Sequence, residues 1–195
     1  MKFVFATGNK GKLSEVRNIF SDTKFEILSL EEIGFTEEII EDGKSFEENS
    51  FIKADRIFSE FKIPVIADDS GLAVDQLNGE PGIYSARYAG ENATYFDNNI
   101  KLLNELKNFS EPHLAKFLCF AVYVDDKNRI SVLGELPGKI IKEFRGEHGF
   151  GYDPIFQPDE FDLTLAQMNL EDKNRISHRA KAFNSLKKKI EEVKM

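Results

Sequence analysis

The sequence predicts an α/β protein with a mixed central sheet and flanking helices, and two observations carry that prediction. Strand-like and helix-like segments alternate through the first half of the 195 residues, as they do where strands pair in parallel. The second half contains a long hairpin at residues 115–136, with its turn near Asp126 to Asn128, which adds an antiparallel pair. The length suits one domain, or one domain with two lobes, and a sizeable core.

The individual elements follow from hydrophobic periodicity. Apolar residues that recur every three or four positions predict helices, and short apolar runs bounded by polar residues predict strands. These patterns place strands at residues 2–6, 25–30 and 63–71, and helices at residues 12–20, 45–61, 94–106 and 177–193. The third strand is expected to end in a turn at its Asp-Asp-Ser-Gly sequence. A loop-rich stretch, residues 144–161, precedes the last helix.

The helical patterns also predict caps and apolar faces. Ser45 and Glu48 form a capping-box pattern at the start of the second helix. In the third helix, Phe96, Ile100 and Leu103 are in phase and form its apolar stripe. The last helix is expected to bury Phe183, Leu186, Ile190 and Val193.

Composition argues against several classes of protein. The formal net charge is −8, whereas a protein that binds nucleic acid without sequence preference is normally basic. We therefore expect no nucleic-acid partner, and a bound anion must be held locally by a few cations, backbone N–H groups or a metal. Cys119 is the single cysteine and lies in an apolar run, which predicts a buried thiol and no internal disulfide. The sequence shows no signal peptide and no apolar run of membrane-spanning length, so we expect a cytoplasmic protein without a membrane partner.

The junction between the first strand and the first helix reads Thr-Gly-Asn-Lys-Gly-Lys over residues 7–12. The spacing of Gly8 and Gly11 fits neither a Walker A loop nor the dinucleotide-binding fingerprint. Glycines nevertheless let a backbone approach a phosphate, the N–H groups of a helix N-terminus point at it, and Lys12 adds positive charge. The alternative is an ordinary polar turn.

Acidic residues gather at two places. Asp68 and Asp69 follow an apolar strand and point to opposite faces, so at most one of them is expected to reach a given site. Carboxylates in such a position suit a hard cation such as Mg²⁺ or serve as a general base. Glu41 and Asp42 precede the long helix and could supply a second metal carboxylate. The alternatives are an Asx turn at the first place and a solvated acidic loop at the second.

A glycine-rich aromatic segment and a cationic segment complete the polar features. Gly149 and Gly151 flank Phe150, whose ring suits stacking with a nucleobase, and Asp153 can read a base edge. Where the last helix is expected to start, the chain gathers Lys173, Arg175, His178 and Arg179. Cations are unfavourable beside a helix N-terminus, which suggests an anion or a purine carbonyl as their ligand. A packed loop and solvated charges are the alternatives.

Taken together, these features indicate a site for a nucleotide and Mg²⁺. Cations and glycines would bind the phosphates, carboxylates would bind the metal and activate water, and an aromatic ring would stack on the base. Residue chemistry alone leads to a Mg²⁺-dependent nucleotide phosphohydrolase or transferase.

The same segments resemble a known family. Residues 6–16, 48–54, 67–90, 149–156 and 176–182, in this order, are similar to the inosine/xanthosine triphosphate pyrophosphatase family and span nearly the whole chain. The resemblance implies an elongated mixed α/β fold over residues 1–195, a single domain with two lobes around a substrate cleft, and usually a homodimer. It also implies Mg²⁺-dependent hydrolysis of ITP, dITP and XTP between the α and β phosphates, which yields the monophosphate and pyrophosphate and removes deaminated purine nucleotides.

The resemblance further implies roles for the matching residues. Asp69 would be the general base and a Mg²⁺ ligand, with Glu41 as the other metal carboxylate. The triphosphate cradle would consist of Thr7, Gly8, Asn9, Lys10, Gly11 and Lys12. Lys53 would be a phosphate-side cation, and Ser70 would contact the substrate. The nucleotide pocket would be formed by Phe150, Gly151, Tyr152 and Asp153, which hold the base, with Lys173, His178 and Arg179.

Selectivity for deaminated purines has a physical basis that we state as a hypothesis. Deamination replaces the purine 6-amino donor with a carbonyl acceptor, so a pocket that offers donors there would favour ITP and XTP over ATP. Arg179, His178 and backbone N–H groups near Phe150 are the candidate donors. One departure from the family pattern is that Glu147 and His148 stand where small residues often precede this loop, which bears on kinetics more than on function.

Three other functions compete with this interpretation. A related pyrophosphatase could act on other modified nucleotides, and a substrate panel would distinguish it. A regulatory module would bind ITP tightly without releasing pyrophosphate, and the presence of both Glu41 and Asp69 argues against it. The net charge of −8 argues against a nucleic-acid-binding protein.

Overall fold

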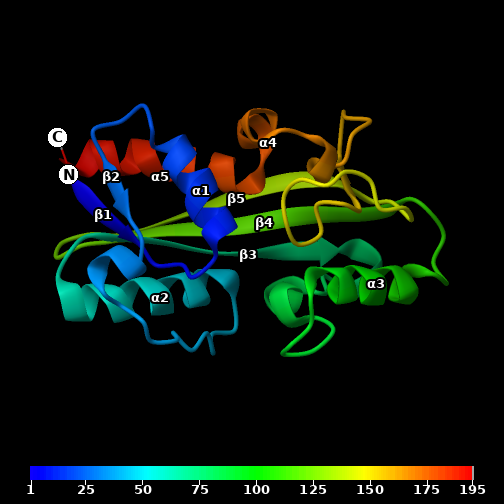
Figure 1. Ribbon diagram of the computed structural model, residues 1–195, viewed down its shortest axis with the longest axis horizontal. Helices are drawn as coiled ribbons and strands as arrows, with labels where there is room; N and C mark the ends of the chain where they lie inside the picture. The colour runs from blue at the N-terminus through cyan, green and yellow to red at the C-terminus, as the bar shows by residue number, and fades with distance from the viewer. Residues whose placement is uncertain (195) are drawn as a thin grey trace. The chain divides into compact units, whose positions relative to one another are not determined.

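A computed structural model describes residues 1–194 and contains a six-stranded sheet with helices on both of its faces (Figure 1). The strand order is β2-β1-β3-β4-β5-β6. The strands are β1 Lys2–Phe5, β2 Glu26–Leu28, β3 Val65–Val74, β4 His113–Val124, β5 Arg129–Ile140 and β6 Phe156–Pro158. β1 pairs in parallel with β2 and β3, whereas β5 and β6 are antiparallel, so the predicted mixed α/β sheet is confirmed.

Four of the helices lie where the hydrophobic periodicity placed them, with shifted ends, whereas the short helix α4 was not predicted. The helices are α1 Lys10–Ile19, α2 Phe46–Phe61, α3 Tyr95–Leu106, α4 Leu170–Ile176 and α5 His178–Lys194. The hairpin turn is also confirmed, because Asp125 N–H donates to the Asn128 carbonyl at 3.0 Å between β4 and β5. No helix within residues 1–194 is long and apolar enough to cross a membrane.

The chain divides into two compact units. The first unit contains Met1–Asp69, Cys119–Gly134 and the described residues from His178 onward. The second unit contains Ser70–Leu118 and Glu135–Ser177, so β3, β4 and β5 each supply residues to both units. The expectation that two lobes of one domain enclose a substrate cleft stays a prediction.

In the first unit the sheet is buried on both faces, because successive strand residues alternate between two cores. Phe3 and Phe5 belong to a core with α1 and α5, whereas Val4 and Ala6 belong to a core with α2. Figure 1 shows α1 and α5 on one side of these strands and α2 on the other. This layering brings the strand-to-helix junction after β1 and the middle of β3 into one unit.

The second unit has its own core, formed where α3 and the loop-rich segment pack on β3, β4 and β5. Leu102 and Leu106 of α3 are fully or almost fully buried in it, together with Leu72, Phe117 and Phe156. The rings of Phe117 and Phe156 are 4.7 Å apart between centroids.

The expectation that the third strand ends at the Asp-Asp-Ser-Gly sequence is wrong. β3 continues through these residues to Val74, and Leu72 and Val74 are fully buried. The reason is that the residues after Gly71 are again apolar and enter the core of the second unit. Asp68 and Asp69 therefore lie within a long strand.

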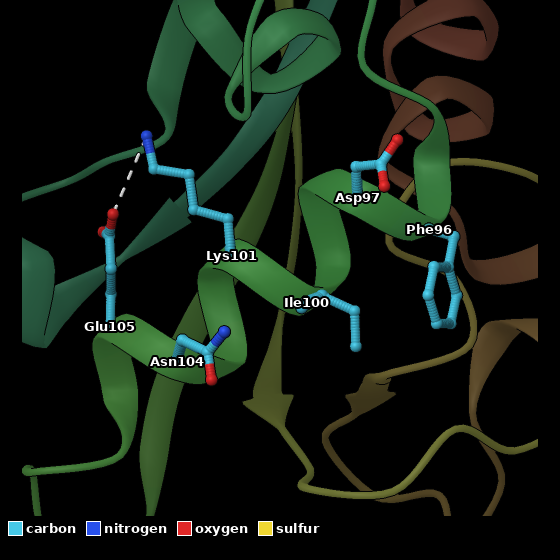
Figure 2. A pocket seen from close by; sticks show the side chains of 6 residues that line it. All are labelled: Phe96, Asp97, Ile100, Lys101, Asn104 and Glu105. Carbon is cyan, nitrogen blue, oxygen red and sulfur yellow. Dashed lines mark ion pairs between the residues drawn. The ribbon is translucent and has the colours of Figure 1, made fainter.

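The predicted apolar stripe of α3 is wrong for Phe96 and Ile100, whereas its third residue, Leu103, packs against the core of the second unit. The side chains of Phe96 and Ile100 are exposed and, in Figure 2, border a shallow hollow on the outside of α3. The side that faces the core carries Leu102 and Leu106 together with Asn98 and Asn99. Both asparagines donate to backbone carbonyls, which allows polar side chains to occupy the buried face.

The helix ends differ from expectation in two further places. Val193 is exposed, whereas the other three residues expected on the buried face of α5 are fully buried. Lys173 and Arg175 lie in the last turn of the short helix α4, where the helix dipole favours cations, and only His178 and Arg179 begin α5. The argument that all four cations crowd a helix N-terminus is therefore wrong for Lys173 and Arg175.

Candidate active site

The junction between β1 and α1 is a capped helix N-terminus in the first unit. Asn9 is the N-cap, and its Oδ1 accepts a hydrogen bond from Lys12 N–H at 3.1 Å. Asn9 N–H in turn donates to the Thr7 hydroxyl at 3.2 Å. A side chain added at Gly8 would meet no atom within 4 Å, so this glycine is not required by packing within the described chain. The geometry suits anion binding by the first turn of α1.

Asp68 forms an ion pair with Lys12, the cation of this junction. The Asp68 side chain is fully buried, and Oδ2 lies 3.1 Å from Lys12 Nζ and 3.3 Å from Arg179 Nε. The Cys119 thiol donates to the same oxygen at 3.6 Å. Burial would raise the pKa of Asp68, but the charges of Lys12 and Arg179 outweigh burial and hold the pKa well below its ordinary value. The carboxylate is therefore a fixed counter-charge, and Cys119 is the buried thiol that the sequence predicted.

Arg179 links this carboxylate to a second one. Its guanidinium is almost fully buried, and Nη1 lies 2.5 Å from Glu15 Oε2 on α1. Burial would lower the pKa of Arg179, but Asp68 and Glu15 together raise it, so the side chain stays charged. Glu15 was missed from the sequence, where it resembles any polar residue of an amphipathic helix.

Asp69 contacts a separate set of residues, as strand alternation predicts. Lys53 Nζ lies 3.9 Å from Asp69 Oδ1 and forms a short contact with Glu41 Oε2. The Lys53 side chain is 8% exposed, so its ammonium is enclosed by the two carboxylates that it neutralises. Three residues expected in the phosphate and metal site, from a loop, α2 and β3, are thus in contact.

Asn49 supports Asp69 and was also missed from the sequence. Its Nδ2 donates to Asp69 Oδ2 at 3.0 Å, and its Oδ1 accepts from Gly43 N–H at 2.9 Å. Asn49 therefore ties the Glu41 loop to β3. The signal that could have found it is its spacing four residues before Lys53 on α2, which places both side chains on one helix face.

Glu41 and Asp69 fit the requirements of Mg²⁺. Their carboxylate oxygens approach a common point, because both contact the Lys53 ammonium. Within residues 1–194, no cluster of three or more His, Cys, Asp or Glu side chains forms a metal cage. Mg²⁺ in nucleotide sites usually takes one or two carboxylates and completes its shell with water and substrate phosphates, so this pair is sufficient.

The loop around Phe150 belongs to the second unit. Gly149 and Gly151 have φ values of +78° and +65°, which only glycine adopts readily. Phe150 N–H donates to Asp153 Oδ2 at 2.9 Å, so this carboxylate closes a turn on its own loop. Tyr152 fixes the far side of the turn by donating its hydroxyl to the Ser85 carbonyl at 3.0 Å.

Lys173 belongs to the same loop cluster. Its Nζ lies 2.7 Å from Asp153 Oδ2, and both side chains are about 5% exposed. The same ammonium lies 4.7 Å from the centroid of the Phe150 ring. The second unit therefore brings together Phe150, Asp153 and Lys173, three residues that the sequence analysis assigned to one pocket.

The remaining expected site residues divide between the units. His178 opens α5 in the first unit and is 4% exposed. Lys10 and Gly11 form the first turn of α1, with Lys10 exposed. Ser70 directly follows Asp69 on β3 and is the first residue of the second unit. Their contacts with a substrate stay predictions.

The sequence and the fold are similar to those of known proteins. A sequence model of the Ham1 family matches residues 3–189. A dITP/XTP pyrophosphatase of Clostridium perfringens is 46% identical over 200 residues, which covers 98% of each chain. The Ham1 protein of Staphylococcus aureus superposes with a TM-score of 0.87 at 41% identity and 98% coverage of both chains. A HAM1 protein of Coxiella burnetii gives 0.89 at 35% identity, covering 98% of this chain and 99% of its own.

Matches of this length leave no large segment of the chain outside the shared fold. The matched residues include the β1–α1 junction, the Asp68–Asp69 strand, the Phe150 loop and the start of α5. This chain belongs to the Ham1 family.

Proposed function

We propose that this chain hydrolyses dITP, ITP and XTP to the nucleoside monophosphate and pyrophosphate, and so removes deaminated purine nucleotides. The observation that carries the proposal is that the first unit places carboxylates that could bind Mg²⁺ close to lysines that could bind phosphate. Lys53 contacts both Glu41 and Asp69, and Asp68, next to Asp69, holds Lys12. A bound triphosphate needs both kinds of group, because its own charge must be neutralised while water is activated.

The enzyme class follows from the family. The chain is a nucleoside-triphosphate pyrophosphatase, a hydrolase of nucleotide metabolism, since curated relatives with 46% identity over nearly the full length carry that activity in their names. Family membership also weighs against the regulatory module and the nucleic-acid-binding protein.

In the proposed reaction Asp69 is the general base. Asn49 orients the carboxylate through Oδ2, while Oδ1 lies on the side of Lys53. Asp69 takes a proton from water as the water oxygen forms a new bond to the α phosphorus. The bond between the α and β phosphates breaks, and pyrophosphate leaves with the bonding electrons. Lys12 and Lys53 bind phosphate oxygens and stabilise the charge that builds on them.

Glu41 and Asp69 would hold Mg²⁺, which when bound neutralises charge on the phosphate oxygens. Without the substrate, the Lys53 ammonium balances both carboxylates. The two contacts hold the Lys53 ammonium beside Glu41 and Asp69, where it could bind a substrate phosphate; a solvated lysine would not be held in this place.

The loop of Phe150 to Asp153 would hold the base, with the Phe150 ring stacked on it. Phe150 N–H is already donated to Asp153, and Arg179 is engaged by Glu15 and Asp68. The N–H groups of Gly151 and Tyr152 make no hydrogen bond within residues 1–194. These two backbone donors are therefore the best supported candidates for reading the 6-carbonyl of a deaminated purine.

Pyrophosphate release from ITP, XTP, GTP and ATP with Mg²⁺ tests the proposal. We expect strong release from ITP and XTP and little from GTP and ATP. Asp69→Asn should lower kcat by about 10²–10⁴-fold, because it removes the general base while keeping the side-chain shape. Asp75→Asn, the same change at an exposed residue of the second unit, is the matched control and should keep wild-type turnover.

Two results would contradict the proposal. Release of orthophosphate would mean that a different phosphoanhydride bond is cut. Equal turnover of ATP and ITP would mean that the nucleotide site is right and the proposed substrate class is wrong.

We also propose that the chain acts as a homodimer, as the family resemblance implies. Light scattering at micromolar concentration should then give twice the 22.2 kDa mass of one chain. A mass of one chain under the assay conditions would refute the dimer without affecting the chemistry.

A further inference from the structure

Asn99 is a buried polar residue on α3 that the proposed chemistry does not use. It is 1% exposed and lies on the buried side of α3, whereas Phe96 and Ile100 border the hollow in Figure 2. Its Nδ2 donates to the Tyr95 carbonyl at 2.7 Å, one turn earlier in α3. The same nitrogen donates to the Gly151 carbonyl at 2.8 Å. The amide therefore joins the first turn of α3 to the middle of the Phe150 loop.

The other end of this side chain is poorly satisfied. Asn99 Oδ1 is buried and accepts no hydrogen bond within residues 1–194. A buried acceptor without a partner destabilises the folded state. What asparagine provides and leucine does not is the pair of N–H bonds, one of which reaches the loop.

The bond to Gly151 acts at a sensitive point of the loop. The Gly151 carbonyl and the Tyr152 N–H belong to one planar trans peptide, so they point in opposite directions. Fixing the carbonyl toward α3 therefore fixes the direction of the Tyr152 N–H, one of the two candidate donors to the base. Gly151 has φ +65°, and glycine offers little intrinsic resistance to rotation of this peptide.

Neighbouring contacts hold the two ends of the loop but not this peptide. Asp153 binds Phe150 N–H, and the Tyr152 hydroxyl binds the Ser85 carbonyl. The Tyr95 ring lies 6.2 Å from the Phe150 ring, so the first turn of α3 and the loop are also adjacent through their side chains. Within residues 1–194, the Gly151 carbonyl accepts its hydrogen bond from the Asn99 amide.

We propose that Asn99 is a positioning residue that orients the Gly151–Tyr152 peptide and thereby sets how tightly the loop holds a deaminated base. This inference rests on the proposed function, because it takes the base as the ligand of the loop. Asn99 acts through the loop and does not touch the phosphates.

The test compares Asn99→Leu with Asn98→Leu. Asn98 is the matched control, because it is a neighbouring buried asparagine whose amide binds the Ala86 carbonyl and Ala89 N–H instead of the loop. For Asn99→Leu we expect KM for ITP to rise about tenfold with kcat changed less than about twofold, which is the signature of lost ground-state binding. The inhibition constant of pyrophosphate should not change, because pyrophosphate carries no base. Asn98→Leu should leave KM for ITP within about twofold of wild type.

Amide hydrogen exchange of residues 149–152 tests the positioning role without reference to activity. Exchange should accelerate in Asn99→Leu and in the smaller variant Asn99→Ala, and stay at the wild-type rate in Asn98→Leu. Unchanged exchange and unchanged KM in both Asn99 variants, or an equal rise of KM in Asn98→Leu, would overturn the inference. A wild-type protein that does not hydrolyse ITP would refute the proposed function, and the exchange comparison would still decide the role of Asn99.

Discussion

At the scale of single residues, the first unit is organised by buried charges that neutralise one another. Arg179 connects Asp68 and Glu15, and all three side chains are almost fully buried. Arg179→Ala should lower the free energy of unfolding by about 3–5 kcal/mol, because the buried Glu15 carboxylate loses this cation and Asp68 keeps the Lys12 ammonium but loses the guanidinium. Arg175→Ala removes the same side chain at an exposed position on α4 and should have little effect. Urea unfolding of both variants measures the difference in stability. Equal stability of the two variants would show that Arg179 does not stabilise the buried carboxylates.

The same network predicts an acid dependence. The pKa of Asp68 is lowered in the folded state, so its contribution to stability is present above the ordinary value near 3.8 and is lost as the pH falls below it. The stability gap between wild type and Asp68→Asn should therefore be constant from pH 6 to about 5 and shrink below about pH 4. Asp75→Asn, an exposed control, should track the wild type at each pH. Urea unfolding across this range measures the gap, and a gap that persists at low pH would contradict the ion-pair account.

At the scale of secondary-structure elements, the sequence predicts elements well and their faces less well. The strands β1 to β5, the four longer helices, the hairpin turn and the Ser45 cap follow from periodicity and local capping, which are properties of neighbouring residues, whereas β6 and α4 were not predicted. The end of β3 was misjudged, because Asp-Asp-Ser-Gly resembles a turn until the buried Leu72 and Val74 beyond it are considered.

The buried face of α3 was misjudged for a related reason. Hydrophobicity selects Phe96 and Ile100, whereas the fold buries Asn98 and Asn99 because distant backbone carbonyls satisfy their amides. Local patterns cannot reveal such partners. Within the candidate site, the sequence analysis named Asp69, Lys53 and the residues of the glycine-rich loops, and it missed Asn49 and Glu15, because the partners of these two residues lie far away in sequence.

At the scale of the whole molecule, the net charge of −8 sets the protein apart from basic anion-binding proteins. Its long-range field repels an anionic nucleotide, and binding depends on Lys12 and Lys53, whose partly or fully buried contacts are screened little by salt. Raising NaCl from about 20 to 150 mM should therefore leave kcat/KM for ITP unchanged or raise it, because salt weakens the long-range repulsion more than the local attraction.

The measurement keeps free Mg²⁺ constant. A second variant, Lys189→Glu, changes an exposed residue of α5 and makes the net charge more negative, so it should increase the dependence of kcat/KM on salt. A steep fall of kcat/KM with salt in the wild type would show instead that exposed cations dominate the approach of the substrate, and would shift attention from the buried lysines to the exposed Lys10.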